Sequence, residues 1–165
     1  MANNRKWRSF AVNLLLFALV MSAIRIWQHR DMASVAPALS GVTLAGQHYA
    51  LAEHRTRPVL VHFWASWCPI CRTEQSSIAA IAENDPDVIT IAMQSGNPEQ
   101  VAAYMASQHI ALPVLNDPDG RIAREWGVHG VPASFIVAPD GQIRFVEVGY
   151  TTGIGLRIRR ALAGI

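Results

Sequence analysis

Blocks of apolar and polar residues alternate along most of the chain, and they predict strands and helices in turn. Short runs rich in β-branched and aromatic residues predict strands, whereas apolar residues spaced three and four apart predict helices. The expected strands cover 58–64, 88–92, 114–115, 133–138 and 142–148, after a small hairpin over 42–51. The expected helices cover 69–83, 98–108, 120–126 and 155–163. This order predicts an α/β layered fold, and the late hairpin around Pro139-Asp140-Gly141 makes the central sheet mixed.

The amino-terminal part of the chain has a different pattern. An apolar run over residues 9–24 follows a cluster of basic residues at 5–8 and precedes Arg25 and Trp27. The run is slightly shorter than the roughly 20 residues that span a bilayer, but Arg25 can extend to the interface and Trp27 can lie in it. We therefore expect one transmembrane helix, with the amino terminus in the cytoplasm and the rest of the chain exported.

The run is also near the upper length limit of a signal peptide, so cleavage is the alternative. The best cleavage sequences are poor, because Pro37 follows Ser34-Val35-Ala36 and the large Met21 precedes Ser22-Ala23. We favour a single-pass inner-membrane anchor through residues 9–27, with the remainder in the periplasm or another extracytoplasmic space. The expected organisation is a tip and anchor over 1–31, a linker over 32–41 and one domain over 42–165.

Composition supports a single folded domain behind this tail. The chain has 165 residues, of which 51% are apolar, and its formal net charge is +2. Residues 1–31 hold five basic groups and one acidic group, whereas residues 32–165 hold nine basic and eleven acidic groups. The basic excess therefore belongs to the tail and gives no reason to expect nucleic-acid binding.

The only two cysteines form the motif Cys68-Pro69-Ile70-Cys71, between an expected strand and an expected helix. Proline suits the first position of a helix, which makes Cys68 the expected N-cap. Unpaired N–H groups and the positive end of the helix dipole favour a thiolate there, so Cys68 is the expected nucleophile. Cys71 follows one turn later, within disulfide reach. We expect a redox-active dithiol.

Three other uses of a cysteine pair compete with this expectation. A purely structural disulfide would close a very small loop and so would remove little entropy from the unfolded chain. The six histidines show no paired spacing for a zinc site, so we expect no bound metal and no other cofactor. Covalent haem attachment needs a histidine directly after the second cysteine, where Arg72 stands.

Three sequence blocks resemble those of thioredoxin-fold proteins. The first is Phe63-Trp64-Ala65-Ser66-Trp67-Cys68-Pro69-Ile70-Cys71, the second is Gly127-Val128-His129-Gly130-Val131-Pro132, and the third is Ala133-Ser134-Phe135-Ile136-Val137 followed by Asp140-Gly141. The match covers residues 38–165, with an extra helix and strand near 97–115. With the anchor, the chain resembles the tethered thioredoxin-like proteins of the bacterial envelope. These include reductases that serve cytochrome c maturation and proteins of the suppressor of copper sensitivity type.

The resemblance implies roles for residues beyond the cysteines. It implies a cis peptide at Val131-Pro132 beside the disulfide, with the Val131 backbone pairing to an extended substrate strand. Trp67 is expected to shield the dithiol and to face the substrate. Glu74 lies on an expected apolar, core-facing stripe with Ile70, Ile78 and Ile81. The resemblance favours a proton-exchanging carboxyl group over an exposed helix-edge glutamate.

His62 departs from the family pattern, because many thioredoxins have a buried aspartate in this strand. A core histidine with satisfied hydrogen bonds is the default expectation for such a position. The alternative is a group that tunes the thiol pKa, either as an imidazolium that favours thiolate or as a neutral proton acceptor.

We therefore expect an enzyme that reduces protein disulfides through Cys68 attack and Cys71 resolution. In an exported compartment disulfides persist, so a membrane electron-donor protein is the expected source of reducing equivalents. The rival hypothesis is a soft-metal module that handles copper, or a redox sensor, because thiolates bind Cu(I) well. A third is an interaction domain with an idle disulfide.

Overall fold

The computed structural model describes residues 12–22, 34–54, 56–83 and 85–164. The chain divides into two units, Met1–Met32 and Ala33–Ile165. In the first unit, residues 12–22 are helical. None of the helices within these described ranges is both long and apolar enough to cross a membrane. The predicted anchor also includes residues 9–11 and 23–27, which lie outside the described residues.

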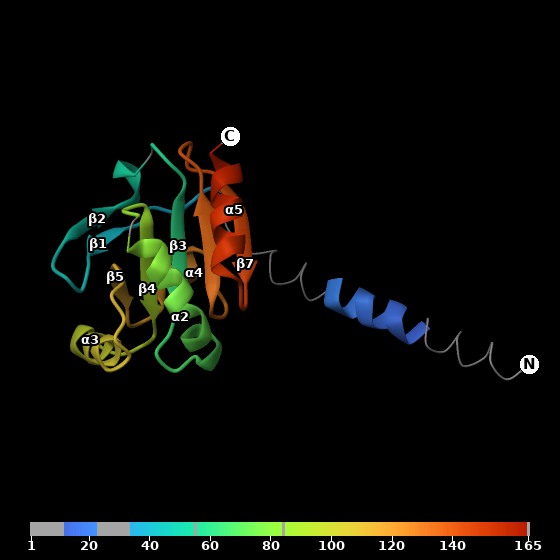
Figure 1. Cartoon of the computed structure of the whole chain (residues 1–165), viewed down its shortest axis with the longest axis horizontal. Coiled ribbons are helices and arrows are strands. Elements are labelled where there is room, and N and C mark those ends of the chain that lie inside the picture. Colours follow the sequence, from blue (N-terminus) through green and yellow to red (C-terminus); the bar gives the residue numbers. More distant parts are fainter. Residues whose placement is uncertain (1–11, 23–33, 55, 84, 165) are drawn as a thin grey trace, which may run out of the picture. The chain divides into compact units, whose positions relative to one another are not determined.

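The second unit contains a five-stranded mixed sheet in the order β5-β4-β3-β6-β7, with helices on both faces (Figure 1). The strands are β1 (Ser40–Val42), β2 (His48–Ala50), β3 (Val59–Trp64), β4 (Val88–Met93), β5 (Val114–Asp117), β6 (Ala133–Val137) and β7 (Ile143–Val148). The helices are η1 (Leu51–Glu53), α2 (Pro69–Ala82), α3 (Pro98–Ser107), α4 (Arg121–Glu125) and α5 (Gly153–Ala163). Strands β3, β4 and β5 are parallel, whereas β6 runs antiparallel to β3 and β7 antiparallel to β6. The predicted α/β fold with a mixed sheet is confirmed.

Helices α2 and α5 pack on one face of the sheet because both turn apolar side chains toward it. Ile78 and Ile81 of α2 and Leu156 of α5 are buried with Leu60 of β3 and Ile136 of β6. Successive strand residues point to opposite faces. His62 and Trp64 therefore share the face that Leu60 uses, and this face carries the dithiol helix.

Helix α4 has only five residues and depends on the strand before it. Its N-cap is Gly120, which offers no side chain. Instead, Asp117 at the end of β5 accepts N–H groups from Ile122 and Ala123 with its two carboxylate oxygens, at 3.0 and 2.9 Å. After α4, Trp126 packs edge-on against Phe135 on the second face of the sheet. Asp117 thereby fixes the start of the segment that leads to Pro132.

The predicted extra helix and strand are α3 and β5. Tyr104 of α3 stacks on Trp64 with ring centroids 5.8 Å apart, and Val101 and Met105 are buried in the same cluster as Cys68 and Cys71. The insertion therefore supplies part of the apolar surroundings of the dithiol.

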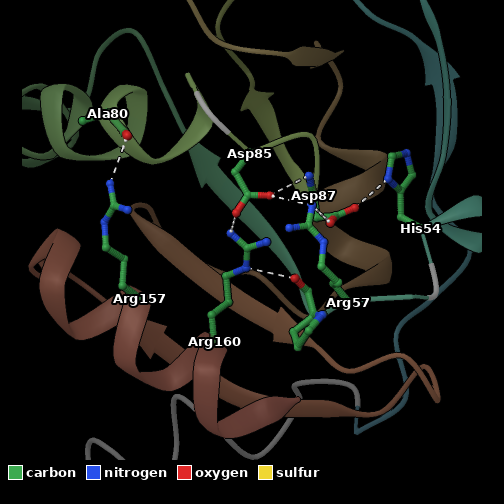
Figure 2. A network of polar contacts seen from close by, with 8 residues as sticks. His54, Arg57, Ala80, Asp85, Asp87, Arg157 and Arg160 are labelled. Atoms are coloured by element: carbon green, nitrogen blue, oxygen red, sulfur yellow. Dashed lines mark hydrogen bonds and ion pairs between the residues drawn. The ribbon is translucent and has the colours of Figure 1, made fainter.

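A network of charged side chains joins several elements at the end of the domain where β3 begins (Figure 2). Arg160 of α5 is paired with Asp85, Arg57 with Asp87 at 2.6 Å, and His54 with Asp87 at 3.0 Å. Burial acts to raise the pKa of Asp85, but the hydrogen bond from Arg160 and other nearby donors and charges lower it below its ordinary value. Two carbonyl groups complete the network, Pro58 bonded by Arg160 and Ala80 bonded by Arg157.

Some details of the predicted elements differ from the structure. We expected Ile70 on the buried stripe of its helix, but its side chain is exposed, and the buried residues are Cys71, Glu74, Gln75, Ile78 and Ile81. The physical reason is that the inward face of the first turn is taken by Cys71. Residues 34–36, within the predicted linker, pair with the turn between β6 and β7.

Candidate active site

The dithiol lies where β3 ends and α2 begins. Cys68 has an extended backbone conformation and is the N-cap of α2, and its sulfur accepts the N–H of Cys71 at 3.1 Å. Pro69 occupies the first helical position, where a missing N–H costs no hydrogen bond. The two cysteines form a disulfide with Cα atoms 5.3 Å apart. The predicted N-cap and the predicted disulfide reach are both confirmed.

The second part of the site comes from the loop before β6. The Val131–Pro132 peptide bond is cis, as the resemblance implied. The carbonyl oxygen of Val131 lies 3.6 Å from Cys68 Sγ, although 63 positions separate the two residues. Pro132 is buried and Val131 half-buried, so the backbone edge of Val131 lies beside the disulfide at the surface of the domain.

Glu74 follows Cys71 by three positions on the inward face of α2, and its side chain has no exposed surface. Its Oε1 accepts the N–H of Thr151 at 3.4 Å, whereas Oε2 has no hydrogen-bond partner among the described residues. Burial raises the pKa of Glu74 to about 7, against the smaller lowering effect of the Thr151 hydrogen bond. A carboxyl group with this pKa can gain or lose a proton near neutral pH.

His62 is also buried, and its Nδ1 lies 2.9 Å from Ser134 Oγ on the neighbouring strand. Burial lowers the pKa of His62 to about 4, so the ring is neutral at pH 7. Of the two tuning roles considered above, only the neutral acceptor applies at neutral pH. The hydrogen bond to Ser134 is also what a satisfied core histidine would make.

The side chain of Trp67 is bonded to the loop that follows β4. Its indole N–H donates to the carbonyl of Gln94 at 3.0 Å, and more than half of its side chain is exposed. Gln94 has a positive φ of 46°, a conformation that residues other than glycine adopt infrequently. Next to Trp67, the N–H of Ser66 donates to Ser95 Oγ at 3.0 Å. The loop after β4 thus holds the active-site loop from one side.

The structure brings all the predicted site residues to one end of the domain, around the carboxyl end of β3 and the first turns of α2. The sequence did not indicate four supporting residues: Ser134, Thr151, Gln94 and Asp117. Ser134, Thr151 and Gln94 act through contacts between distant parts of the chain. Asp117 instead bonds residues five and six positions later, and it had a local sign, a carboxylate shortly before a helix whose N-cap is glycine. The described residues contain no cluster of three or more His, Cys, Asp or Glu side chains that could hold a metal ion.

Comparison with known proteins places this site among thiol-disulfide proteins. The AhpC/TSA family model matches residues 32–146. The chain is 27% identical over 152 residues to the thioredoxin-like protein of Haemophilus influenzae, which covers 90% of this chain and 89% of that protein. It is 33% identical over 138 residues to the thiol:disulfide interchange protein DsbE homolog of Paracoccus denitrificans, with 78% and 75% covered.

A solved structure agrees with these sequence relatives. The crystal structure of a thiol:disulfide interchange protein of the thioredoxin family from Chlorobium tepidum superposes with a TM-score of 0.67 and 26% identity. The superposition covers 79% of this chain and 95% of that one. The thioredoxin-like fold that the sequence predicted is therefore confirmed.

Proposed function

We propose, from the premise that the chain belongs to the AhpC/TSA family, that it is a thiol-disulfide oxidoreductase that reduces disulfides in other proteins. The observation that carries this function is the disulfide itself. Cys68 is at a helix N-terminus, Cys71 is fully buried beneath it, and the backbone of Val131 lies alongside. This arrangement gives the two thiols different environments, as an attacking and a resolving cysteine require.

The reaction proceeds in two exchanges. The Cys68 thiolate attacks one sulfur of the partner disulfide, the partner S–S bond breaks, and the other partner sulfur leaves as a thiolate. The Cys71 thiolate then attacks Cys68 Sγ, which releases the second partner thiolate and forms the Cys68–Cys71 disulfide. Two electrons pass from the dithiol to the partner, so each turnover leaves the enzyme oxidised.

The surrounding residues have separate roles in these steps. The Val131 backbone, with Pro132 and Trp67 beside it, aligns the cysteine-bearing segment of the partner. Glu74 takes the proton of Cys71 when that thiol attacks, since it is the nearest buried carboxyl group along the inward face of α2 and its pKa is near 7. His62 is neutral and fixed by Ser134, and it tunes the thiols as a proton acceptor or a buried dipole.

The proposed setting is the bacterial envelope. The apolar run after the basic cluster supports an inner-membrane anchor through residues 9–27, with the catalytic domain outside the cytoplasm. A membrane electron-donor protein then re-reduces the Cys68–Cys71 pair, because disulfides persist in that compartment. The resemblance to envelope reductases supports cytochrome precursors or copper-stress proteins as substrates.

Trapping with insulin as the disulfide substrate tests this function. The full chain, purified in detergent and supplied with dithiothreitol, should reduce insulin faster than dithiothreitol alone. After reduction and removal of dithiothreitol, Cys71→Ser should accumulate a mixed disulfide between Cys68 and an insulin cysteine, detected by intact mass. The matched control Cys68→Ser,Cys71→Ser should form no such adduct.

Two results would contradict the proposal. The first is a folded Cys71→Ser protein whose Cys68 reacts with iodoacetamide but forms no adduct with insulin. The second is stoichiometric Cu(I) binding by the reduced protein without any acceleration of insulin reduction, which would favour the soft-metal module.

A further inference from the structure

The hydroxyl group of Ser95 joins the loop after β4 to the turn that precedes Cys68. Its Oγ accepts the N–H of Ser66 at 3.0 Å and donates to the carbonyl of Met93 at 3.0 Å. A serine hydroxyl has one proton and two lone pairs, so it can make both bonds at once. Ser66 lies two positions before Cys68, and the hydroxyl therefore ties the segment that carries the nucleophile to the end of β4.

That segment has few other ties. The N–H of Cys68 donates to the carbonyl of Ala65 at 3.2 Å, which closes the turn upon itself. Within the described part of the chain, the hydrogen bonds of Ser66 and Trp67 both go to the loop after β4, one from the Ser66 N–H and one from the Trp67 indole. Only the Ser66 bond comes from the backbone, so it is the one that fixes the path of the main chain into Cys68.

The loop itself is held by the inserted strand and helix. The N–H of Gln94 donates to the carbonyl of Asp117 in β5 at 2.8 Å, and Nδ2 of Asn116 in the same strand donates to the carbonyl of Gly96 at 3.0 Å. Asn97 then caps α3, and its side chain accepts an N–H of the first helical turn. The loop is thus bonded to both elements of the insertion, which set where its serine hydroxyl lies.

The position of Cys68 decides how reactive its sulfur is. Cys68 is the N-cap of α2, and its Sγ accepts the N–H of Cys71 at 3.1 Å. In the reduced protein this N–H and the positive end of the helix dipole favour thiolate over thiol, and their effect falls off within the first turn. A turn that moved away from the start of α2 would lose this stabilisation of the thiolate.

We propose that Ser95 is a positioning residue for the exchange reaction, and that it holds the Ser66 backbone so that Cys68 Sγ stays over the first turn of α2. Through Ser95, the insertion sets the reactivity of a nucleophile that it does not carry. This inference rests on the proposed function and assigns the source of the Cys68 reactivity on which that function depends.

The pH profile of Cys68 alkylation tests this role. In the Cys71→Ser background, the full chain in detergent is reduced, freed of dithiothreitol and treated with iodoacetamide, whose carbon is attacked by the thiolate with loss of iodide. The rate at each pH follows the thiolate fraction of Cys68. Ser95→Ala removes the hydroxyl and Ser95→Thr keeps it. Ser107→Ala is the matched control, because the Ser107 hydroxyl donates within α3, to the carbonyl of Tyr104.

At pH 6, Ser95→Ala should be alkylated at least about threefold more slowly than the parent, because a smaller fraction of its Cys68 is ionised. Its profile should move to higher pH and meet the parent profile where both thiols are fully ionised. A merely structural role would lower the free energy of unfolding and leave the profile in place. Ser95→Thr should restore the parent profile, and Ser107→Ala should keep it.

An unchanged profile in Ser95→Ala, with its fold verified by circular dichroism, overturns the positioning role. If that variant does not fold, Asn116→Ala decides in its place, since it releases the Gly96 carbonyl from β5 and should move the profile in the same direction. Failure of the proposed function is a different result, in which the wild-type protein does not reduce insulin, whatever the alkylation profiles of the variants.

Discussion

Two ionisable side chains buried beneath the dithiol, Glu74 and His62, respond to burial in opposite directions. Burial raises the pKa of Glu74 to about 7 and lowers that of His62 to about 4, because in both cases the uncharged form is the one that needs less solvation. At pH values between about 4 and about 7, the carboxyl group of Glu74 and the imidazole of His62 are both neutral. The region under the disulfide therefore holds a carboxylic acid that can act as a proton acceptor only after it has ionised near neutral pH.

Glu74→Gln should change the pH dependence of stability. The ordinary pKa of this carboxyl group is 4.5, so between pH 4.5 and 7 the folded protein binds more protons there than the unfolded chain. Its stabilising contribution is complete below pH 4.5 and is lost as the pH rises through 7. Relative to Glu74→Gln, the oxidised wild-type protein should lose up to about 3 kcal/mol across this range.

Chemical unfolding followed by tryptophan fluorescence at several pH values provides the measurement. His62 is present in both proteins, so its protonation in acid destabilises both equally. This effect cancels in the difference between their free energies of unfolding. A difference between wild type and variant that stays constant from pH 4.5 to 8 would refute a raised pKa at Glu74. In single-turnover experiments, the variant should also slow resolution by Cys71 without slowing the first attack by Cys68.

At the scale of single residues, the sequence identified the reactive residues but not their hydrogen-bond partners. The CxxC motif followed by helical spacing was enough to assign Cys68 as the N-cap, because capping is local. The hydrogen bonds of Glu74 to Thr151 and of His62 to Ser134 join residues 77 and 72 positions apart. Local patterns cannot indicate such contacts, since they depend on how the strands align.

At the scale of elements, the active site depends on short segments that cannot form alone. Helix α4, with five residues, is too short to be stable in isolation, and it leads directly to the loop that carries Pro132. Asp117 supports it by accepting two N–H groups at its start. The position of the Val131 backbone beside Cys68 therefore depends partly on a carboxylate in β5.

Asp117→Ala should destabilise the protein by about 3 kcal/mol, because it leaves two buried N–H groups without a charged acceptor. Asp119→Ala is the matched control in the same turn, since Asp119 is exposed and its carboxylate accepts one backbone N–H, from Arg121 at 3.4 Å. That change should cost no more than about 0.5 kcal/mol. Denaturant unfolding of the full chain measures the loss of stability in each variant. Equal losses in the two variants would contradict the capping role of Asp117.

The elements themselves were largely predictable, and the errors have physical reasons. Strand β5 was expected at 114–115 but extends to Asp117, because pairing with β4 continues through two polar residues. Ile70 was expected to be buried because it shares a helical stripe with Glu74 and Ile78. In the first turn of α2 the sheet-facing position belongs to Cys71, and Ile70 is free to face a partner.

At the scale of the whole domain, the two ends of the sheet carry different groups of residues. One end carries the dithiol, where β3 stops and β6 starts. The opposite end carries the charged network of Figure 2, together with residues 34–36, which pair with the turn between β6 and β7. Residues 34–36 therefore lie at the end of the domain away from Cys68, where they do not obstruct the approach of a partner protein to the dithiol.

The proposed anchor predicts both the mass and the topology of the protein in a Gram-negative host. Because proline follows the best cleavage sequence at residues 34–36, the chain should keep its amino-terminal residues and sediment with membranes at its full mass of 18.1 kDa. With the basic cluster held in the cytoplasm, Cys68 should face the periplasm.

After mild reduction of spheroplasts, a membrane-impermeant maleimide should therefore label Cys68, and Cys68→Ser,Cys71→Ser should remain unlabelled as the control. A mass corresponding to a chain that begins at Pro37 would replace the anchor with a cleaved signal peptide, while periplasmic labelling would still stand. Labelling of Cys68 only after the membrane is permeabilised would instead place the domain in the cytoplasm. A reductase of exported disulfides cannot work there, so this outcome would refute the envelope setting itself.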